Sequence, residues 1–332
     1  MSPGSKASRI ERYVHHSGEK LEIPVGRIVG DRPGPRFSVS AGMHAGEPAG
    51  MNAAIRLWRD IDPAQLSGQL LIIPLMSTRA FFSRNMQLSP IDQKELHFQL
   101  VGNPEGTYSE FQIDCVFNLL RDSNYHVDMH GAEHAQALDP WVAFFEPQDP
   151  RQSEEAWMLA SSFPVRYLDP RNRDNMADGL PYALLQAGVV NVWPEIGLDH
   201  RLEREASDMQ YQGVINAMRK LRMLDGEPEE VPEQIVVGPD RWMVLAENSG
   251  YWRRFVEPGE RVSKGQSLGE IRDLEGEVIE EVTAPADGLI QFLATSPGIN
   301  VDRVPHGYPW HQGLARLVQV REDRRPPTPR AG

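Results

Sequence analysis

The chain contains a single cysteine, Cys115, among its 332 residues. One cysteine excludes an internal disulfide, and a chain of this kind suits a reducing compartment. No run of about 18 apolar residues occurs, which excludes a predicted transmembrane helix. Residues 1–6 show no apolar signal core. We therefore expect a cytoplasmic protein that has no membrane partner.

Basic residues are also scarce, because 34 Lys and Arg stand against 47 Asp and Glu, a formal net charge of -13. Nucleic-acid binding rests on basic surfaces that meet phosphate, so this balance argues against a nucleic-acid partner and disfavours anionic membrane surfaces. With 40% apolar and 24% charged residues, the chain has an ordinary globular composition and room for one large core or two domains. The expected partner is a small-molecule substrate, and a homo-oligomer stays open.

Strand-like and helix-like segments alternate over residues 36–224. Residues 70–76 form a continuous apolar run that is typical of a strand buried on both faces. Residues 77–110 lack clear periodicity and are expected to form a long loop, which in a compact domain is usually functional. The alternation predicts an α/β fold with a mostly parallel twisted sheet flanked by helices. In such a sheet, ligands bind beyond the carboxyl ends of the strands.

A polar, proline-bearing stretch at residues 225–232 separates this pattern from a region of short strands and turns. The change predicts a catalytic domain over residues 1–230 and a smaller all-β domain over residues 231–322. Residues 323–332 are rich in Pro and Arg, and we expect them to form a disordered tail.

The clearest chemical signal is a turn at residues 40–49, between a short strand at 36–40 and a helix that starts near Pro48. His44 and Glu47 lie about one helical turn apart, so an imidazole and a carboxylate can converge on one point. Nitrogen and oxygen ligands at the carboxyl end of a strand suit a catalytic zinc ion, which needs about three protein ligands. The turn therefore predicts part of a zinc site.

Candidates to complete this site follow the later predicted strands. His130 is the best supply of a third ligand, and Asp128 shares its strand face, where it can act as the carboxylate partner of the imidazole. Glu195 is the best-placed general base, and Arg84 can stabilise the oxyanion of a tetrahedral intermediate. Each residue alone is more commonly a surface or structural residue. Their combination with the turn at His44 favours a site.

In the order and spacing of these motifs, the chain resembles the succinylglutamate desuccinylase/aspartoacylase family of zinc-dependent amide hydrolases. Residues 42–47 resemble the zinc-binding turn of the family, residues 128–130 its D-L-H segment, and residues 194–197 its E-x-G segment. The resemblance implies a carboxypeptidase-type α/β fold with a C-terminal β domain. It also implies one Zn²⁺ per chain held by His44, Glu47 and His130, with Glu195 as general base and Arg84 polarising the scissile carbonyl.

The chain departs from the family at its K-D-L-N-R-x-F segment, whose Asn and Arg hold the carboxylate of the substrate. Here Lys94 begins the segment, His97 stands in place of the Asn, and Phe98 stands in place of the Arg. A phenylalanine cannot make the bidentate ion pair that arginine makes with a carboxylate. We therefore expect these three residues to line a substrate pocket that favours an uncharged or aromatic group.

The sequence thus predicts a zinc-dependent hydrolase that cleaves the amide bond of a small N-acyl amine or N-acyl amino-acid derivative. One alternative is a carboxypeptidase-like peptidase that acts on short peptides. The other is a catalytically inactive protein that binds a metal or a metabolite. The β domain argues against the first, because it narrows the cleft in the family that the chain resembles. The retention of ligands, base and arginine argues against the second.

Overall fold

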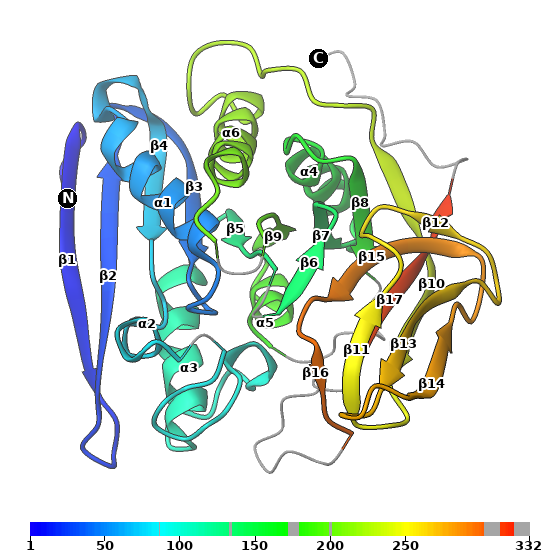
Figure 1. Ribbon diagram of the computed structural model, residues 1–332. Coiled ribbons are helices and arrows are strands. Elements are labelled where there is room, and N and C mark those ends of the chain that lie inside the picture. Colours follow the sequence, from blue (N-terminus) through cyan, green and yellow to red (C-terminus); the bar gives the residue numbers. More distant parts are fainter. Residues whose placement is uncertain (86, 133–134, 172–178, 199–200, 302–312, 322–332) are drawn as a thin grey trace.

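The protein is described by a computed structural model over residues 1–85, 87–132, 135–171, 179–198, 201–301 and 313–321 (Figure 1). Its strands form a large sheet of 13 strands and a smaller sheet of four. The order across the large sheet is β1 (Ser5–Val14), β2 (Lys20–Val29), β4 (Ser67–Ile73), β3 (Arg32–Ala41), β5 (Tyr125–Met129), β9 (Val190–Glu195), β7 (Trp141–Phe145), β8 (Tyr167–Arg171), β10 (Ile235–Leu245), β17 (Gly313–Arg321), β15 (Gly288–Ala294) and β12 (Arg261–Val262), and β6 (Gln136–Leu138) pairs with β15 off this path.

Helices cover both faces of the first part of this sheet, as the alternating pattern predicts. On one face, the apolar sides of α1 (Pro48–Asp60), α4 (Pro150–Ala160) and α6 (Arg204–Lys220) share a buried core with the central strands. On the other face, α3 (Tyr108–Leu120) and α5 (Leu180–Gln186) contact each other and share a second buried core with β2 and β4, and α5 also contacts β9. No helix in the described part of the chain is both long and apolar enough to cross a membrane.

The prediction of a mostly parallel sheet is wrong. β4, β3, β5 and β9 are parallel neighbours, but β1 and β2 form an antiparallel hairpin and β7 runs antiparallel to β9. The apolar pattern of a strand reports its burial, whereas the direction depends on the connection. Residues 15–19 are too few for the crossover that a parallel pair needs, so β1 and β2 must be antiparallel.

The C-terminal strands form the smaller sheet and also extend the large one. β14 (Val278–Thr283), β13 (Ser267–Arg272), β11 (Gly250–Arg254) and β16 (Gly298–Ile299) make the small sheet. The other long strands, β10, β17 and β15, continue the large sheet beyond β8 through a parallel pairing of β10 with β8. The division at residue 230 stays a prediction, and the expected tail at 323–332 lies outside the described residues.

The long loop expected at residues 77–110 contains regular structure. α2 spans Thr78–Ser83, and a 3₁₀ turn spans Leu96–Phe98. Both elements are shorter than the window over which helical periodicity can be recognised, so the apolar pattern does not reveal them. The 3₁₀ turn brings the 94–98 segment to the site described next.

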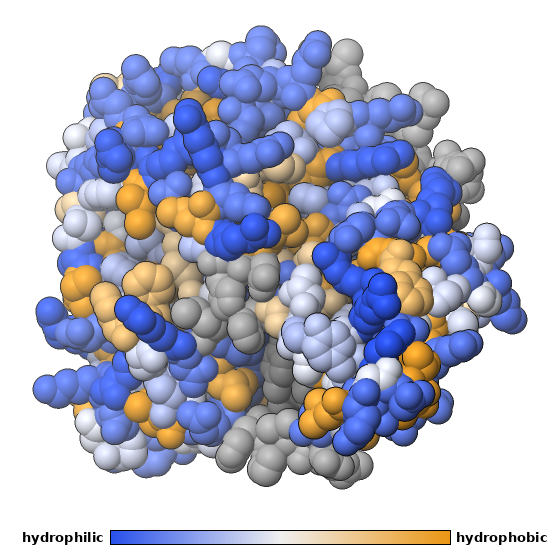
Figure 2. Space-filling model, in the orientation of Figure 1, coloured by the Kyte–Doolittle hydropathy of each residue, from blue (hydrophilic) through white to orange (hydrophobic). Residues whose placement is uncertain are grey.

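Hydrophilic residues dominate much of the molecular face seen in Figure 2, and apolar residues appear between them in small groups. This surface is in keeping with a chain in which 24% of the residues are charged. Scattered apolar residues are ordinary on a protein surface and do not by themselves mark a binding site. This face therefore does not by itself indicate a function.

Candidate active site

The turn between β3 and α1 is held in place by its neighbours in the fold. Gly42 has a φ angle of +64°, and a Cβ atom there would lie 2.7 Å from Leu75 Cδ1, so both the backbone conformation and the space require glycine. The Ser77 backbone amide donates to the Gly42 carbonyl at 2.9 Å, and the Ser77 hydroxyl donates to the Met43 carbonyl at 2.7 Å. These contacts fix the path of the residues that follow, His44 and Glu47.

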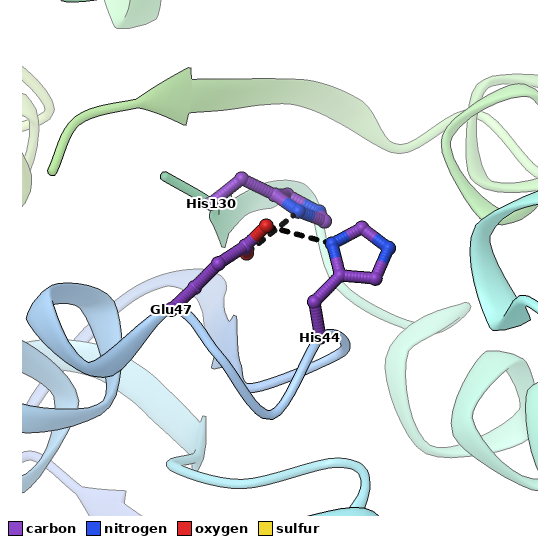
Figure 3. Close-up of side chains that lie close together, drawn as sticks. All are labelled: His44, Glu47 and His130. Atoms are coloured by element: carbon purple, nitrogen blue, oxygen red, sulfur yellow. Dashed lines mark hydrogen bonds and ion pairs between the residues drawn. The ribbon is translucent and has the colours of Figure 1, made fainter. Parts of the chain in front are cut away.

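The turn meets the end of β5, and three side chains converge there (Figure 3). His44 Nδ1 lies 2.7 Å from Glu47 Oε1, and His130 Nδ1 lies 3.1 Å from Glu47 Oε2. All three residues are buried, and each offers one ligand atom within 4.8 Å of the others. A Cβ atom at Gly50 would lie 2.8 Å from the Cβ atom of Met129, so a glycine there lets α1 approach β5 closely.

The second nitrogen of each histidine faces a further carboxylate. His44 Nε2 lies 2.7 Å from Glu95 Oε1, and His130 Nε2 lies 3.1 Å from Asp128 Oδ2. Metal-binding histidines usually donate their other ring N–H to a carboxylate, a carbonyl or water, which fixes the tautomer and the orientation of the ring. Because each Nε2 faces a carboxylate, both Nδ1 atoms are directed at Glu47. The three possible ligand atoms therefore converge, as a metal site requires.

Opposite charges in this cluster outweigh the cost of burial. Burial works to lower the pKa of His44, but Glu47 and Glu95 hold it well above its usual range. Burial likewise opposes the charged form of His130, and Asp128 and Glu47 raise its pKa. For Glu47, burial favours the neutral form, yet the two histidines lower its pKa to about 2. Protons on the imidazoles thus supply positive charge where a divalent cation would supply it.

Two buried oxygen atoms of the cluster have no hydrogen-bond partner among the described residues, Glu47 Oε2 and Glu95 Oε2. The 3.1 Å approach of His130 to the first of these lacks the geometry of a hydrogen bond. A buried carboxylate oxygen without a partner is costly, and a metal ligand is one of the few roles that accounts for it. The donor set of two imidazoles and one carboxylate, together with the oxygen of Glu47 that makes no hydrogen bond, fits a zinc ion.

Glu95 is a functional candidate that the sequence motifs do not predict. It lies in the 94–98 segment, and its carboxylate also accepts a hydrogen bond from the backbone amide of His97 at 2.9 Å. One signal was available, because Glu95 retains the acidic character of the Asp that the family has at this place. The segment therefore keeps a carboxylate for His44 although it has lost the clamp.

Replacing Glu95 by glutamine is expected to lower the affinity for zinc by about 10-fold to 100-fold, because partners of this kind raise the basicity of a metal-binding imidazole and hold its orientation. Competition with a chelator measures the affinity. Glu105→Gln, which changes an exposed carboxylate, serves as the matched control. Equal zinc affinity in the two variants would contradict the role of Glu95.

A second buried hydrogen-bond network holds Asp128 on the side away from His130. The Ser40 hydroxyl donates to Asp128 Oδ1 at 2.7 Å and lies 3.2 Å from His126 Nε2, and the Ser38 hydroxyl lies 2.9 Å from His126 Nδ1. Burial lowers the pKa of His126 to about 4, which keeps the ring neutral at neutral pH. The network orients the carboxylate that in turn orients His130.

Acidification is expected to destabilise the fold through His126. Above pH 6.5 the ring is neutral in the folded and unfolded states. As the pH falls from 6.5 to about 4, only the unfolded chain takes up the proton, so the free energy of unfolding falls by on the order of 3 kcal/mol. Denaturant unfolding at pH 7 and pH 4.5 measures this loss. His126→Gln is expected to reduce the loss, and an unchanged loss would exclude His126 as its source.

The cluster opens into a cavity of about 260 Å³. Its walls are formed by His44, Glu47, Glu95, His97, Phe98, His130, Gly131, Gln136, Leu138, Trp141, Arg171, Trp193, Glu195, Phe292 and Arg316. Glu195 lies beside His130, because the Ile196 amide donates to the His130 carbonyl at 3.0 Å and the His130 amide donates to the Pro194 carbonyl at 2.9 Å. The cavity therefore joins the three metal-ligand candidates to the predicted base.

Of the other predicted site residues, two line this cavity and two do not. His97 and Phe98 line it, and Phe98 is 46% exposed. Arg84 caps the C-terminal end of α2 with an exposed side chain, and Lys94 directs its Nζ to within 4.0 Å of Glu110. Neither residue is among those that line the cavity. Their roles in catalysis and substrate binding stay predictions.

Comparison with solved structures places this architecture among known folds. The chain superimposes on a succinylglutamate desuccinylase/aspartoacylase from Rhodobacter sphaeroides with a TM-score of 0.82 and 20% identity, covering 96% of each chain. The chain has the succinylglutamate desuccinylase/aspartoacylase fold. The same fold occurs in the product-bound ectoine utilization protein EutE (DoeB) from Ruegeria pomeroyi, with a TM-score of 0.81, 21% identity and 95% coverage of each chain. The predicted resemblance is confirmed.

Sequence comparison adds a relative whose name states a deacetylase activity. The N-alpha-acetyl-L-2,4-diaminobutyric acid deacetylase of Halomonas elongata is 25% identical over 286 residues, which cover 84% of this chain and 83% of the relative. No family model matches the chain. The chain thus shares the deacylase fold and is similar in sequence to a deacetylase.

Proposed function

We propose that the protein is a zinc-dependent hydrolase that removes the acyl group from a small N-acyl amine or N-acyl amino-acid derivative. The observation that carries the proposal is the convergence of His44, Glu47 and His130 at the wall of a cavity that also contains Glu195. The similarity to a deacetylase and the shared fold support the same reaction class. The cytoplasmic location stays a prediction from the single cysteine.

In this proposal, His44, Glu47 and His130 hold the metal, and Glu95 and Asp128 hold the two imidazoles. Zinc, when bound, supplies a Lewis acid that brings the pKa of water toward neutrality. Glu195 takes a proton from the attacking water and delivers it to the leaving amine. The cavity keeps the reaction to small substrates, since about 260 Å³ accommodates a compact molecule rather than a protein chain.

A panel of N-acetyl amino acids and simple N-acetyl amines tests this function. The panel includes N-alpha-acetyl-L-2,4-diaminobutyric acid, the compound in the name of the similar deacetylase. Zinc-loaded protein is expected to release the free amine from at least one member, to lose this activity with a chelator and to regain it with zinc. Activity that survives the chelator, or no release from any member, would contradict the proposal.

The loss of the clamp at Phe98 predicts the response to substrates with a second carboxylate. N-acetylaspartate and N-succinylglutamate are expected to be poor substrates, because one of their carboxylates would lie unpaired against an apolar ring. Phe98→Arg is expected to raise kcat/KM for these compounds relative to matched substrates in which that carboxylate is amidated. Efficient turnover by the wild type, with no improvement in Phe98→Arg, would show that the group is held elsewhere.

A further inference from the structure

The active-site cavity has a second charged region, formed by Arg316 of β17 and Arg171 of β8. Arg316 lies on a strand that is paired on both sides. Its Cζ atom lies over the rings of Trp141 and Phe292, 5.0 and 5.2 Å from the two ring centroids. Across the described residues it forms no ion pair, and its buried Nε has no hydrogen-bond partner. Burying a charged guanidinium costs folding free energy unless an anion pairs with it.

The carboxylates nearby do not balance the positive charge of this region, because Asp169 and Glu195 are the two carboxylates that act on three arginines, Arg171, Arg241 and Arg316. Asp169 is buried and already forms ion pairs with two arginines, Arg171 at 2.7 Å and Arg241. Arg171 is only 10% exposed, and its buried Nε also lacks a hydrogen-bond partner in the described structure. Burial, followed by the charge of Arg171, lowers the pKa of Arg316 to about 9, although Asp169 and Glu195 act in the opposite direction.

The surroundings of Arg316 prepare it for a planar anion. The contacts of the guanidinium with the rings of Trp141 and Phe292 are cation–π contacts, which use none of its N–H donors and leave them for a ligand. A guanidinium edge matches the two oxygen atoms of a carboxylate in a bidentate pair. Arg316 and the metal-ligand candidates line one cavity, so one small molecule can reach both.

We propose that Arg316, supported by Arg171, binds a carboxylate of the substrate and thereby selects N-acyl amino acids over N-acyl amines. This inference rests on the proposed function, because it assigns a group of the molecule that is hydrolysed. It places the selecting residue on β17, in the C-terminal part of the chain, rather than in the 94–98 segment. Arg316 pairs with the carboxylate of a substrate that has only one. A second carboxylate would lie against Phe98, which cannot form an ion pair with it.

The test compares N-acetyl-L-amino acids with their matched carboxamides in two measurements. Calorimetry measures the binding of each compound to the zinc-loaded protein carrying Glu195→Gln, in which turnover is suppressed. Steady-state kinetics measures kcat and KM in the wild-type background. Both are repeated with Arg316→Gln, Arg316→Lys and, as a control, Arg241→Gln, which removes a guanidinium that contacts Asp169 but does not line the cavity. Thermal unfolding checks that each variant folds.

The free acids are expected to bind at least about 10-fold more tightly than the carboxamides. Arg316→Gln is expected to remove this preference mainly through KM, Arg316→Lys to keep part of it, and Arg241→Gln to keep it. A wild-type protein without preference for the acids overturns the inference, and so does a preference that survives Arg316→Gln. An equal fall of kcat for acids and carboxamides in Arg316→Gln also overturns it, because that pattern belongs to an oxyanion-stabilising group.

The binding measurement separates this inference from the proposed function. If the acids bind preferentially through Arg316 but no compound is hydrolysed by the wild type, the deacylase function fails and the carboxylate site stands. If compounds are hydrolysed with no preference for acids, the function stands and the role of Arg316 fails.

Discussion

Replacing Glu195 by glutamine is expected to lower kcat by about 10²-fold or more while the zinc content stays near that of the wild type. The amide of glutamine keeps the size of the side chain but cannot accept the proton of the attacking water. Glu195 lines the cavity beside His130 without belonging to the group of three metal-ligand candidates, so the metal site is expected to remain.

Kinetics on the best substrate of the panel, together with metal analysis of the same preparation, tests this expectation. Glu205→Gln, an exposed carboxylate in the first turn of α6, is the matched control and should behave as the wild type. Activity of Glu195→Gln within a few-fold of the wild type would mean that another group acts as the base. If the variant lost both its zinc and its activity, Glu195 would instead belong to the metal site.

His130→Ala is expected to lose most of the bound zinc and, with it, nearly all activity. The change removes one of the three metal-ligand candidates and leaves Asp128 buried without its imidazole partner. His44→Ala should act in the same way, because it removes the ligand candidate whose Nε2 faces Glu95. Metal content is measured on purified protein after dialysis against trace zinc, with His16→Ala, an exposed histidine, as the control. Wild-type metal content in both ligand variants would exclude this assignment.

Local sequence was enough to predict most of the candidate metal site. A strand, a glycine-bearing turn and a helix with proline at its start placed His44 and Glu47 together within four residues. The alternation of side chains along β5 placed Asp128 and His130 on one face. Both inferences depend on near neighbours in the chain, so they needed no knowledge of strand order.

The parts that sequence reasoning did not predict depend on distant pairings. Arg316 enters the cavity because β17 pairs with β10 and β15 and thereby continues the large sheet. Nothing in the short strands after residue 230 indicates that they join that sheet. Glu95 reaches His44 from a segment without periodicity, across a sequence separation of 51 residues. The direction of β7 was likewise hidden, because a buried strand has the same apolar pattern in either direction.

The most direct test of the metal site is X-ray diffraction from crystals of the zinc-loaded protein, with data collected on both sides of the zinc absorption edge. The account predicts one anomalous peak per chain in contact with Nδ1 of His44, Nδ1 of His130 and the carboxylate of Glu47, while Glu95 and Asp128 stay on the Nε2 atoms. A peak bound elsewhere, or none between these three residues at saturating zinc, would contradict it.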